Sequence, residues 1–253
     1  GDVYKSQLLH VDTRWKFKAM YESRNEIAEK TGLEMIVHIN PEGIEKNINP
    51  FDHGSSLHTD VMKTQSLIQA LGKYKFDVAF GGARRDEEKS RAKERVFSFR
   101  NSNQQWDPKN QRPELWNIFN GKHFEGEHFR AFPISNWTEM DVWEYIKLEK
   151  IDLPSLYFSH KRKCVERDGV ILAASKHINL KDGEEIIEKT VRYRTCGDMP
   201  ITGAVYSEAD TTEKIKDMLY IKASEKIEKI RSSVASSMSV SYTHLTLPTK
   251  RIV

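Results

Sequence analysis

Cysteine is scarce in this chain, and long apolar runs are absent from it. The two cysteines, Cys164 and Cys196, do not make a disulfide framework and are too few for a cysteine-ligated metal site. No stretch approaches the roughly eighteen consecutive apolar residues of a transmembrane helix, and the first residues lack the apolar core of a signal peptide. We therefore expect a protein of the reducing cytoplasm that neither spans nor binds a membrane.

Excess charge of one sign is also small. The 40 basic and 37 acidic side chains leave a formal net charge of +3, whereas proteins that bind nucleic acid usually carry a larger positive excess. We expect no nucleic-acid partner, so any anion site must come from local clustering of basic residues. The 253 residues, 38% of them hydrophobic, suffice for one folded domain, alone or with an extension.

Hydrophobic spacing predicts an alternation of strands and helices in the N-terminal part. The expected elements are strands at 8–11, 33–39 and 76–80, helices at 17–31 and 59–71 with Gly32 and Thr59 as caps, and a loop at 40–56. This order is typical of a parallel α/β sheet, in which ligands bind beyond the carboxyl ends of the strands.

The later part of the chain gives fewer signals. Thr138 is a plausible helix N-cap with Asp141 as its capping-box partner, and the helix that follows should turn Val142, Trp143 and Ile146 to the core. The remaining expectations are a helix or a strand at 184–191, a charged helix at 211–229, and a tail at 239–253 whose abrupt loss of charge indicates a foreign or disordered segment.

The first candidate site follows the strand at 76–80. Gly81 and Gly82 would let backbone N–H groups approach a ligand, and the adjacent cations Arg84 and Arg85 would repel each other unless an anion lay between them. If a helix begins after Asp86, then Arg91 and Arg95 share one face and Glu87 can orient Arg91. The alternative for residues 87–95 is a solvated, salt-bridged helix.

The second candidate site follows the strand at 8–11. Asp12 at a strand end can accept a ribose hydroxyl or hold a metal ion, and Thr13 stands beside it. The alternative is that Asp12 or Thr13 merely caps the next helix.

Other polar groups give weaker signals. The spacing of His53 and His58 suits no familiar metal motif, and Gly54 favours a turn there. The polar loop at 106–113 could cover a site or contact a partner, and the sequence does not decide between them. A second group of anion-compatible residues contains Arg192, Arg194, Thr202 and Gly203. The P-loop, nucleophile-elbow and zinc-protease motifs are absent.

Several motifs resemble the small subunit of heterodimeric sulfate adenylyltransferase. They are HVDTRWKF (10–17), HINPEGI (38–44), INPF (48–51), GGARRDEEKSRAKERV (81–96), WDPKNQRPELWN (106–117), FPISNWTEMDVWEYI (132–146) and RYRTCGDMPITGAVYSEADT (192–211). The resemblance runs from about Leu8 to about Met238.

The resemblance implies a Rossmann-like α/β fold of the PP-loop ATP pyrophosphatase and phosphoadenylyl-sulfate reductase group. It implies transfer of AMP from ATP to sulfate, giving adenylyl sulfate and pyrophosphate, with a GTPase large subunit as partner. Mg²⁺ is implied by the ATP chemistry, with ligands that stay unassigned. The residues expected to hold pyrophosphate or sulfate oxygens are Arg84, Arg85, Arg91 and Arg95, and those expected to meet the nucleotide are Asp12, Thr13, Gly81 and Gly82.

The chain departs from the family pattern at both ends. The family's S-x-G-K-D-S loop lies upstream of HVDT, and Ser237–Met238 is followed by an unrelated tail. We expect a partial nucleotide-binding domain at 1–150, an extension for substrate and partner contacts at 151–238, and a tail at 239–253 that contributes nothing to stability. Without the family's loop, we expect the chain alone to be inactive.

Two rival functions stay open. A phosphoadenylyl-sulfate reductase needs a redox cysteine in an E-C-G-L-H-like motif, and neither Cys164 nor Cys196 lies in such a context. The chain could instead be a non-catalytic binding partner of the GTPase subunit.

Overall fold

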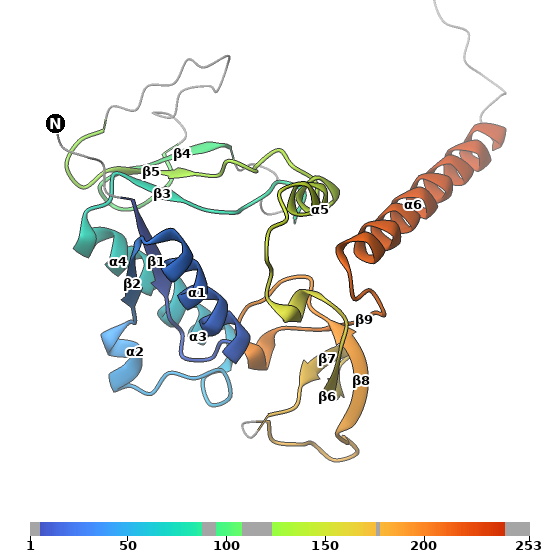
Figure 1. The fold of residues 1–253 in the computed structure, drawn as a ribbon, viewed down its shortest axis with the longest axis horizontal. Helices are drawn as coiled ribbons and strands as arrows, with labels where there is room; N and C mark the ends of the chain where they lie inside the picture. Colours follow the sequence, from blue (N-terminus) through green and yellow to red (C-terminus); the bar gives the residue numbers. More distant parts are fainter. Residues whose placement is uncertain (1–5, 88–94, 108–122, 176–177, 241–253) are drawn as a thin grey trace, which may run out of the picture.

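The computed structural model describes residues 6–87, 95–107, 123–175 and 178–240 (Figure 1). Its first layer is a parallel pair of strands, β1 (Gln7–Val11) and β2 (Glu34–His38), joined by helix α1 (Lys18–Thr31). Gly32 ends α1 in the left-handed conformation with φ of 65° and donates its N–H to the carbonyl of Ala28, which confirms the predicted cap.

The start of α1 corrects one expectation. Phe17 is its N-cap residue and provides no side-chain hydrogen bond. The alternative in which Asp12 or Thr13 caps this helix is therefore wrong. Phe17 is 3% exposed, so burial of its ring, and not a polar cap, fixes the entry of the chain into α1.

The segment expected to be a loop at 40–56 contains helix α2 (Pro41–Glu45). The side chain of Asn40 accepts hydrogen bonds from the backbone N–H groups of Glu42 and Gly43, at 3.1 and 3.4 Å. Proline at the first helical position fits because its missing N–H would have no intrahelical partner. Asn40 and Pro41 are thus a helix start, and the loop prediction was wrong at this point.

The next helix begins earlier than predicted. Helix α3 (Gly54–Thr59), a π-helical segment (Asp60–Gln65) and α4 (Ser66–Tyr74) follow without a break. Thr59 consequently lies within helical structure and is not the cap. Packing explains the continuity, since α4 packs against β1 and β2 and Met62 in the π-helical segment is 1% exposed.

A second, three-stranded sheet has the order β3–β5–β4, formed by Val78–Phe80, His128–Ala131 and Phe97–Arg100. β3 is parallel to β5, and β4 is antiparallel to it. The parallel pairing and the mixed α/β class expected from the sequence are confirmed, with the pairs divided between two sheets. The helix expected after Asp86, with Arg91 on its face, lies outside the described residues, as does most of the loop at 106–113.

The described chain after residue 150 holds a sheet that the sequence did not predict. Four antiparallel strands have the order β7–β6–β8–β9, formed by Val170–Ala173, His160–Arg167, Ile187–Arg192 and Val205–Tyr206. The open choice between helix and strand at 184–191 is settled as a strand from Ile187 onward. Phe17 packs on Tyr193 beside this sheet, with ring centroids 4.7 Å apart, so Phe17 from the N-terminal part of the chain shares a core with the C-terminal sheet.

Helices α5 (Glu139–Leu148) and α6 (Thr212–Val240) pack against each other, and α6 projects from the rest of the molecule (Figure 1). Trp143 is 5% exposed and lies in a small core with Ala209 and Ile215. The predicted capping box is present: Thr138 Oγ1 accepts the N–H of Asp141, and Asp141 Oδ2 accepts the N–H of Thr138.

Replacing Thr138 with alanine should lower the free energy of unfolding by about 1 kcal/mol, because one N-terminal N–H of α5 loses its acceptor. Thr138→Ser retains the hydroxyl and should stay close to the wild type. Chemical denaturation of the three proteins measures the difference. Equal losses in both variants would show that the methyl group of Thr138, and not its hydroxyl, matters.

Candidate functional site

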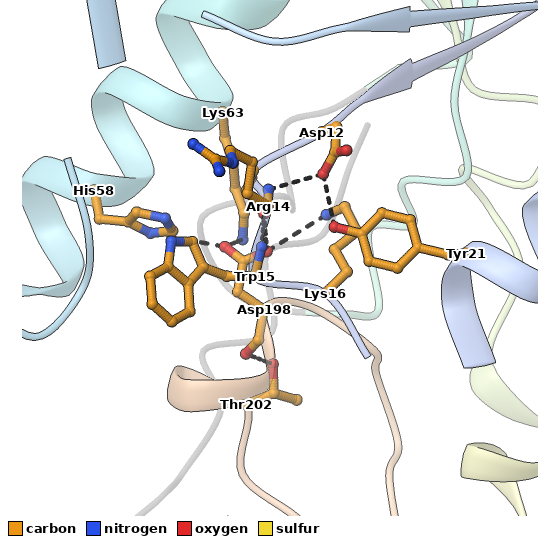
Figure 2. A network of polar contacts seen from close by, with 10 residues as sticks. Asp12, Arg14, Trp15, Lys16, Tyr21, His58, Lys63, Asp198 and Thr202 are labelled. Atoms are coloured by element: carbon orange, nitrogen blue, oxygen red, sulfur yellow. Dashed lines mark hydrogen bonds and ion pairs between the residues drawn. The ribbon is translucent and has the colours of Figure 1, made fainter. Parts of the chain in front are cut away.

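A buried carboxylate, that of Asp198, connects the end of β1 with the helical segment at 54–74 (Figure 2). Its side chain is 0% exposed. Thr13 Oγ1 donates to Asp198 Oδ1 at 2.5 Å, and Lys16 Nζ lies 3.5 Å from the same oxygen. Lys63 Nζ lies 3.1 Å from Oδ2. Three side chains, one of them from the helical segment, thus converge on one anion.

Backbone contacts hold Asp198 in place. The N–H of Met199 donates to the carbonyl of Trp15 at 2.7 Å, and Thr202 Oγ1 donates to the carbonyl of Asp198 at 2.7 Å. A Cβ atom at Gly197 would lie 3.0 Å from Thr202 Oγ1, so the turn before Asp198 leaves little room for a side chain. The carboxylate therefore has a defined position before any ligand arrives.

The two lysines decide the charge state of Asp198. Burial by itself would raise the pKa of this carboxyl, but the hydrogen bond from Thr13 and the charges of Lys16 and Lys63 together lower it below its usual value. Asp198 is therefore ionised at neutral pH. Lys16 and Lys63 are 17% and 35% exposed, so the network presents positive charge toward solvent beside the end of β1.

His58 borders the same network. Its ring is fully buried, and Nδ1 lies 3.7 Å from Asp198 Oδ2. Burial lowers the pKa of His58, and the nearby carboxylate opposes that shift only in part. The turn expected near Gly54 is present, with φ of 77°, but His58 itself lies in α3. Among the described residues, no group of three or more His, Cys, Asp and Glu side chains is arranged to hold a metal ion.

Asp12 has separate contacts. Its Oδ1 accepts the backbone N–H of Arg14 at 2.8 Å and the hydroxyl of Tyr21 at 2.7 Å. Arg14 has φ of 66°, a conformation that non-glycine residues rarely adopt, and its N–H···Oδ1 hydrogen bond to Asp12 stabilises this conformation. Burial, with help from Asp12, raises the pKa of Tyr21, so its hydroxyl remains a donor. Asp12 thus stabilises the backbone conformation at the end of β1.

The end of β3 opens into a cavity of about 600 Å³. Its charged lining includes Arg84, paired with Asp86 at 3.6 Å, and Arg194, paired with Glu139. Apolar parts of its wall come from Ile134, Val142, Trp143, Ile146 and Leu153. The cavity therefore combines a partly apolar wall with two arginines and the carboxylates of Asp86, Glu87 and Glu139, a mixture of apolar and polar lining that is typical of ligand pockets.

Gly81 and Gly82, which follow β3, were expected to let backbone N–H groups approach a ligand, and the structure corrects this for Gly81. The N–H of Gly81 donates to the carbonyl of Ala131 at 2.9 Å and continues the strand pairing, so this donor is not available to a ligand. A Cβ at Gly81 would lie 3.0 Å from the ring of Phe132, which explains the need for glycine there. Gly82 is exposed and lines the cavity.

The structure brings only some of the expected site residues together. Arg84 faces the cavity, whereas Arg85 is half-buried and donates its backbone N–H to the carbonyl of Ser135. Arg95 is exposed just before β4, and Arg91 lies outside the described residues. In the second group of anion-compatible residues, Arg194 lines the cavity and Thr202 donates a hydrogen bond to the carbonyl of Asp198. Arg192 is buried, 1% exposed.

Sequence reasoning missed Asp198, Lys16 and Lys63. Asp198 stands in the segment RTCGDMP, directly after a glycine and two positions before a proline, and this was the one available signal. Lys63 lies among helix-forming residues and resembles any surface lysine. Its role depends on a partner that only the folded chain brings near.

No helix in the described part of the chain has the length and apolar character needed to cross a membrane.

Comparison with known proteins identifies relatives along most of the chain. The sequence profile described as "Phosphoadenosine phosphosulfate reductase domain" matches residues 2–204. A protein of Aliivibrio fischeri named sulfate adenylyltransferase subunit 2 is 61% identical over 221 residues, which are 87% of this chain and 73% of that protein. A Marinobacter nauticus protein named "Sulfate adenylyltransferase subunit 2 2" is 60% identical over 221 residues, which are 87% of this chain and 73% of that protein.

A third relative extends the match. Sulfate adenylyltransferase subunit 2 of Shewanella putrefaciens is 57% identical over 232 residues, which are 91% of this chain and 77% of that protein.

Replacing Asp198 with asparagine should lower the free energy of unfolding by roughly 3 kcal/mol, because a buried pair loses its anion while Lys16 and Lys63 stay close together. Denaturant titration monitored by circular dichroism measures this loss. The exposed pair of Glu42 and Lys46 provides the control, since Glu42→Gln should leave the unfolding midpoint unchanged. A similar midpoint for Asp198→Asn and Glu42→Gln would contradict the assignment.

The lowered pKa of Asp198 also predicts an acid dependence. A carboxyl whose folded pKa lies below its unfolded value stabilises the fold above that unfolded value, about 3.9 for Asp. This contribution is lost as pH falls through the folded pKa. Between about pH 5 and the acid transition, the stability of the wild type should therefore fall more steeply than that of Asp198→Asn. Parallel curves would show that Asp198 does not titrate differently on unfolding.

Proposed function

The chain belongs to the sulfate adenylyltransferase subunit 2 family, within the phosphoadenosine phosphosulfate reductase domain family, and we propose that its two strand ends form the substrate site. Its function is that of a nucleotidyltransferase of sulfate activation, which transfers AMP from ATP to sulfate and releases pyrophosphate.

The observation that carries the site assignment is the cavity beside Gly82. It begins where β3 ends, and Arg84 is one of its lining residues. In this reaction a sulfate oxygen attacks the α-phosphorus of ATP, and pyrophosphate leaves with the electron pair of the broken P–O bond. Negative charge gathers around the phosphorus without a covalent enzyme intermediate, so fixed cations and positioning supply the catalysis.

We assign the anion-holding role to Arg84 and Arg85, together with Arg91 and Arg95. Arg84 has the most support, because it is partly buried at the cavity and its Nη1 has no hydrogen-bond partner among the described residues. Arg95 has the least, because it is exposed. Gly82 remains the better of the two glycines for close approach of a ligand.

We assign the nucleotide to the end of β1, beside Asp12 and Thr13. The hydroxyl of Thr13 is already committed to Asp198, so Thr13 acts by fixing the strand end. Mg²⁺ usually binds through one or two carboxylates plus substrate phosphates, so it fits this chain as an ion carried by ATP. Asp12 is the carboxylate at β1 that could contact it.

The partner that we propose is a GTPase large subunit, and the name "subunit 2" of the relatives supports a second subunit. α6 supplies a surface for it, since the helix projects from the molecule (Figure 1) and exposes Tyr220, Ile221 and Ile227. The cytoplasm remains the predicted location.

A reductase function is disfavoured by the cysteines. Both thiols are free, and Cys164 is fully buried. Burial raises the pKa of Cys196 to about 11, which leaves little reactive thiolate at neutral pH.

In the complete enzyme, Arg84→Ala and Arg85→Ala should each lower the rate of sulfate-dependent pyrophosphate release by on the order of a hundredfold. Each change removes a cation that stabilises the developing charge. Lys46→Ala removes an equal charge from the exposed end of α2 and should leave the rate unchanged. The assignment fails if both arginine variants keep rates within about twofold of the wild type at unchanged stability.

A further inference from the structure

A second cavity, of about 310 Å³, lies at the opposite end of the β3–β5–β4 sheet from the cavity beside Gly82. Asp77, which precedes β3, and His128, which begins β5, belong to its lining. Because these two strands are parallel, their starts lie at one edge of the sheet, whereas Gly82 follows the end of β3. Among the described residues the two cavities share no lining residue, so a ligand in the second cavity would not occupy the proposed substrate site.

The inner part of this cavity holds two buried acceptors. His128 is 2% exposed, and its Nε2 has no hydrogen-bond partner among the described residues. Burial, together with the charges of Arg130 and Arg100, lowers the pKa of His128 to about 4, so the ring is neutral at neutral pH and can present Nε2 as an acceptor. The side-chain oxygen of Gln104 is likewise buried without a partner in the described chain, and it can only accept. Both atoms therefore suit a ligand that donates hydrogen bonds.

The entrance to the cavity carries more acidic than basic side chains. The described lining has three carboxylates, those of Asp77, Glu125 and Glu127, against one ammonium group, that of Lys75. The side chains of Asp77 and Glu125 are 75% and 91% exposed, which places them at the solvent side. Lys75 Nζ lies 3.6 Å from Glu125 Oε1, and His123 Nε2 lies 3.4 Å from Asp77 Oδ1. Negative charge thus remains at the entrance after Lys75 has offset one carboxylate.

Apolar side chains complete the wall of the cavity. They come from Leu71 near the end of α4 and from Phe76 and Phe124. The backbone N–H of Phe124 donates to Glu127 Oε2 at 2.8 Å, which fixes the turn that carries both residues. Aliphatic and aromatic groups offer contact for a hydrocarbon chain, and aromatic rings also attract cations.

We propose that this cavity binds a small alkyl diammonium ion. Each ammonium group has three donors and no acceptor, which matches a cavity whose open buried atoms are acceptors. One ammonium group is held by His128 and Gln104 in the inner part, and the other by the carboxylates at the entrance, with the hydrocarbon chain against the apolar wall. This inference goes beyond the proposed function and does not rest on it.

Calorimetric titration of the full chain with 1,4-diaminobutane at constant ionic strength tests the proposal. The Kd should be about 1 mM or lower, an affinity within reach of so small a ligand. The neutral compound 1,4-butanediol has the same length and should bind at least about tenfold more weakly, because it brings no charge to the carboxylates.

Two variants remove the inner acceptors one at a time. His128→Phe keeps a ring and Gln104→Leu keeps a similar volume, and each should raise the Kd for 1,4-diaminobutane roughly 10- to 100-fold, the loss expected for a hydrogen bond to a charged group. Glu42→Gln removes a carboxylate outside the cavity and should leave the Kd unchanged. Gln104 is only half-buried, so Gln104→Leu provides the test even if His128→Phe does not fold.

Three results would overturn the diammonium site. They are the absence of saturable binding at concentrations roughly twentyfold above the expected Kd, equal affinity for 1,4-butanediol, and a Kd unchanged in the folded variants, which would place the diamine elsewhere on the protein. None of these measurements requires turnover. A wild-type enzyme that releases no pyrophosphate with sulfate would overturn the proposed function and leave this site untouched.

Discussion

The position of one ionised carboxylate in a dry environment constrains much of this structure. Asp198 can keep its charge only because Thr13, Lys16 and Lys63 compensate for the lost water. These partners fix the end of β1 and the helix that packs behind it. A buried ion pair adds little to the free energy of unfolding, but its charged groups compensate for one another in one arrangement only. The arrangement therefore favours accurate placement of the strand end, which a nucleotide site requires.

Local signals predicted local structure well. Gly32 ended α1 and Thr138 with Asp141 began α5, because each of these residues acts through backbone groups within a turn of itself. Asn40 carried an equally local signal, but the surrounding Asn, Pro and Gly residues favoured a loop. The prediction that Thr59 begins a helix was wrong because tertiary packing outweighed the local signal. Met62, three residues later, is buried, and the helical structure continues through Thr59.

The site was harder to predict because its residues meet only in the folded chain. Thr13 and Asp198 are separated by 185 positions, and no periodicity relates them. The rule that ligands bind beyond the carboxyl ends of parallel strands did place Asp12, Thr13 and Arg84 at strand ends where a ligand can bind. It could not tell that Thr13 would be committed to Asp198. Nor could it tell that Gly81 was required by Phe132, since a glycine needed for packing and one needed for a ligand look alike in sequence.

The two polar regions differ in the way that they treat a buried charge. Around Asp198 the fold itself supplies compensating cations, Lys16 and Lys63, although both ring nitrogens of His58 lack a hydrogen-bond partner among the described residues. Around Arg192, which is 1% exposed, Nε and Nη1 have no hydrogen-bond partner among the described residues. Burying a guanidinium whose donors lack partners costs free energy of folding, so Arg192 lowers the stability of the fold whose strand end Asp198 positions.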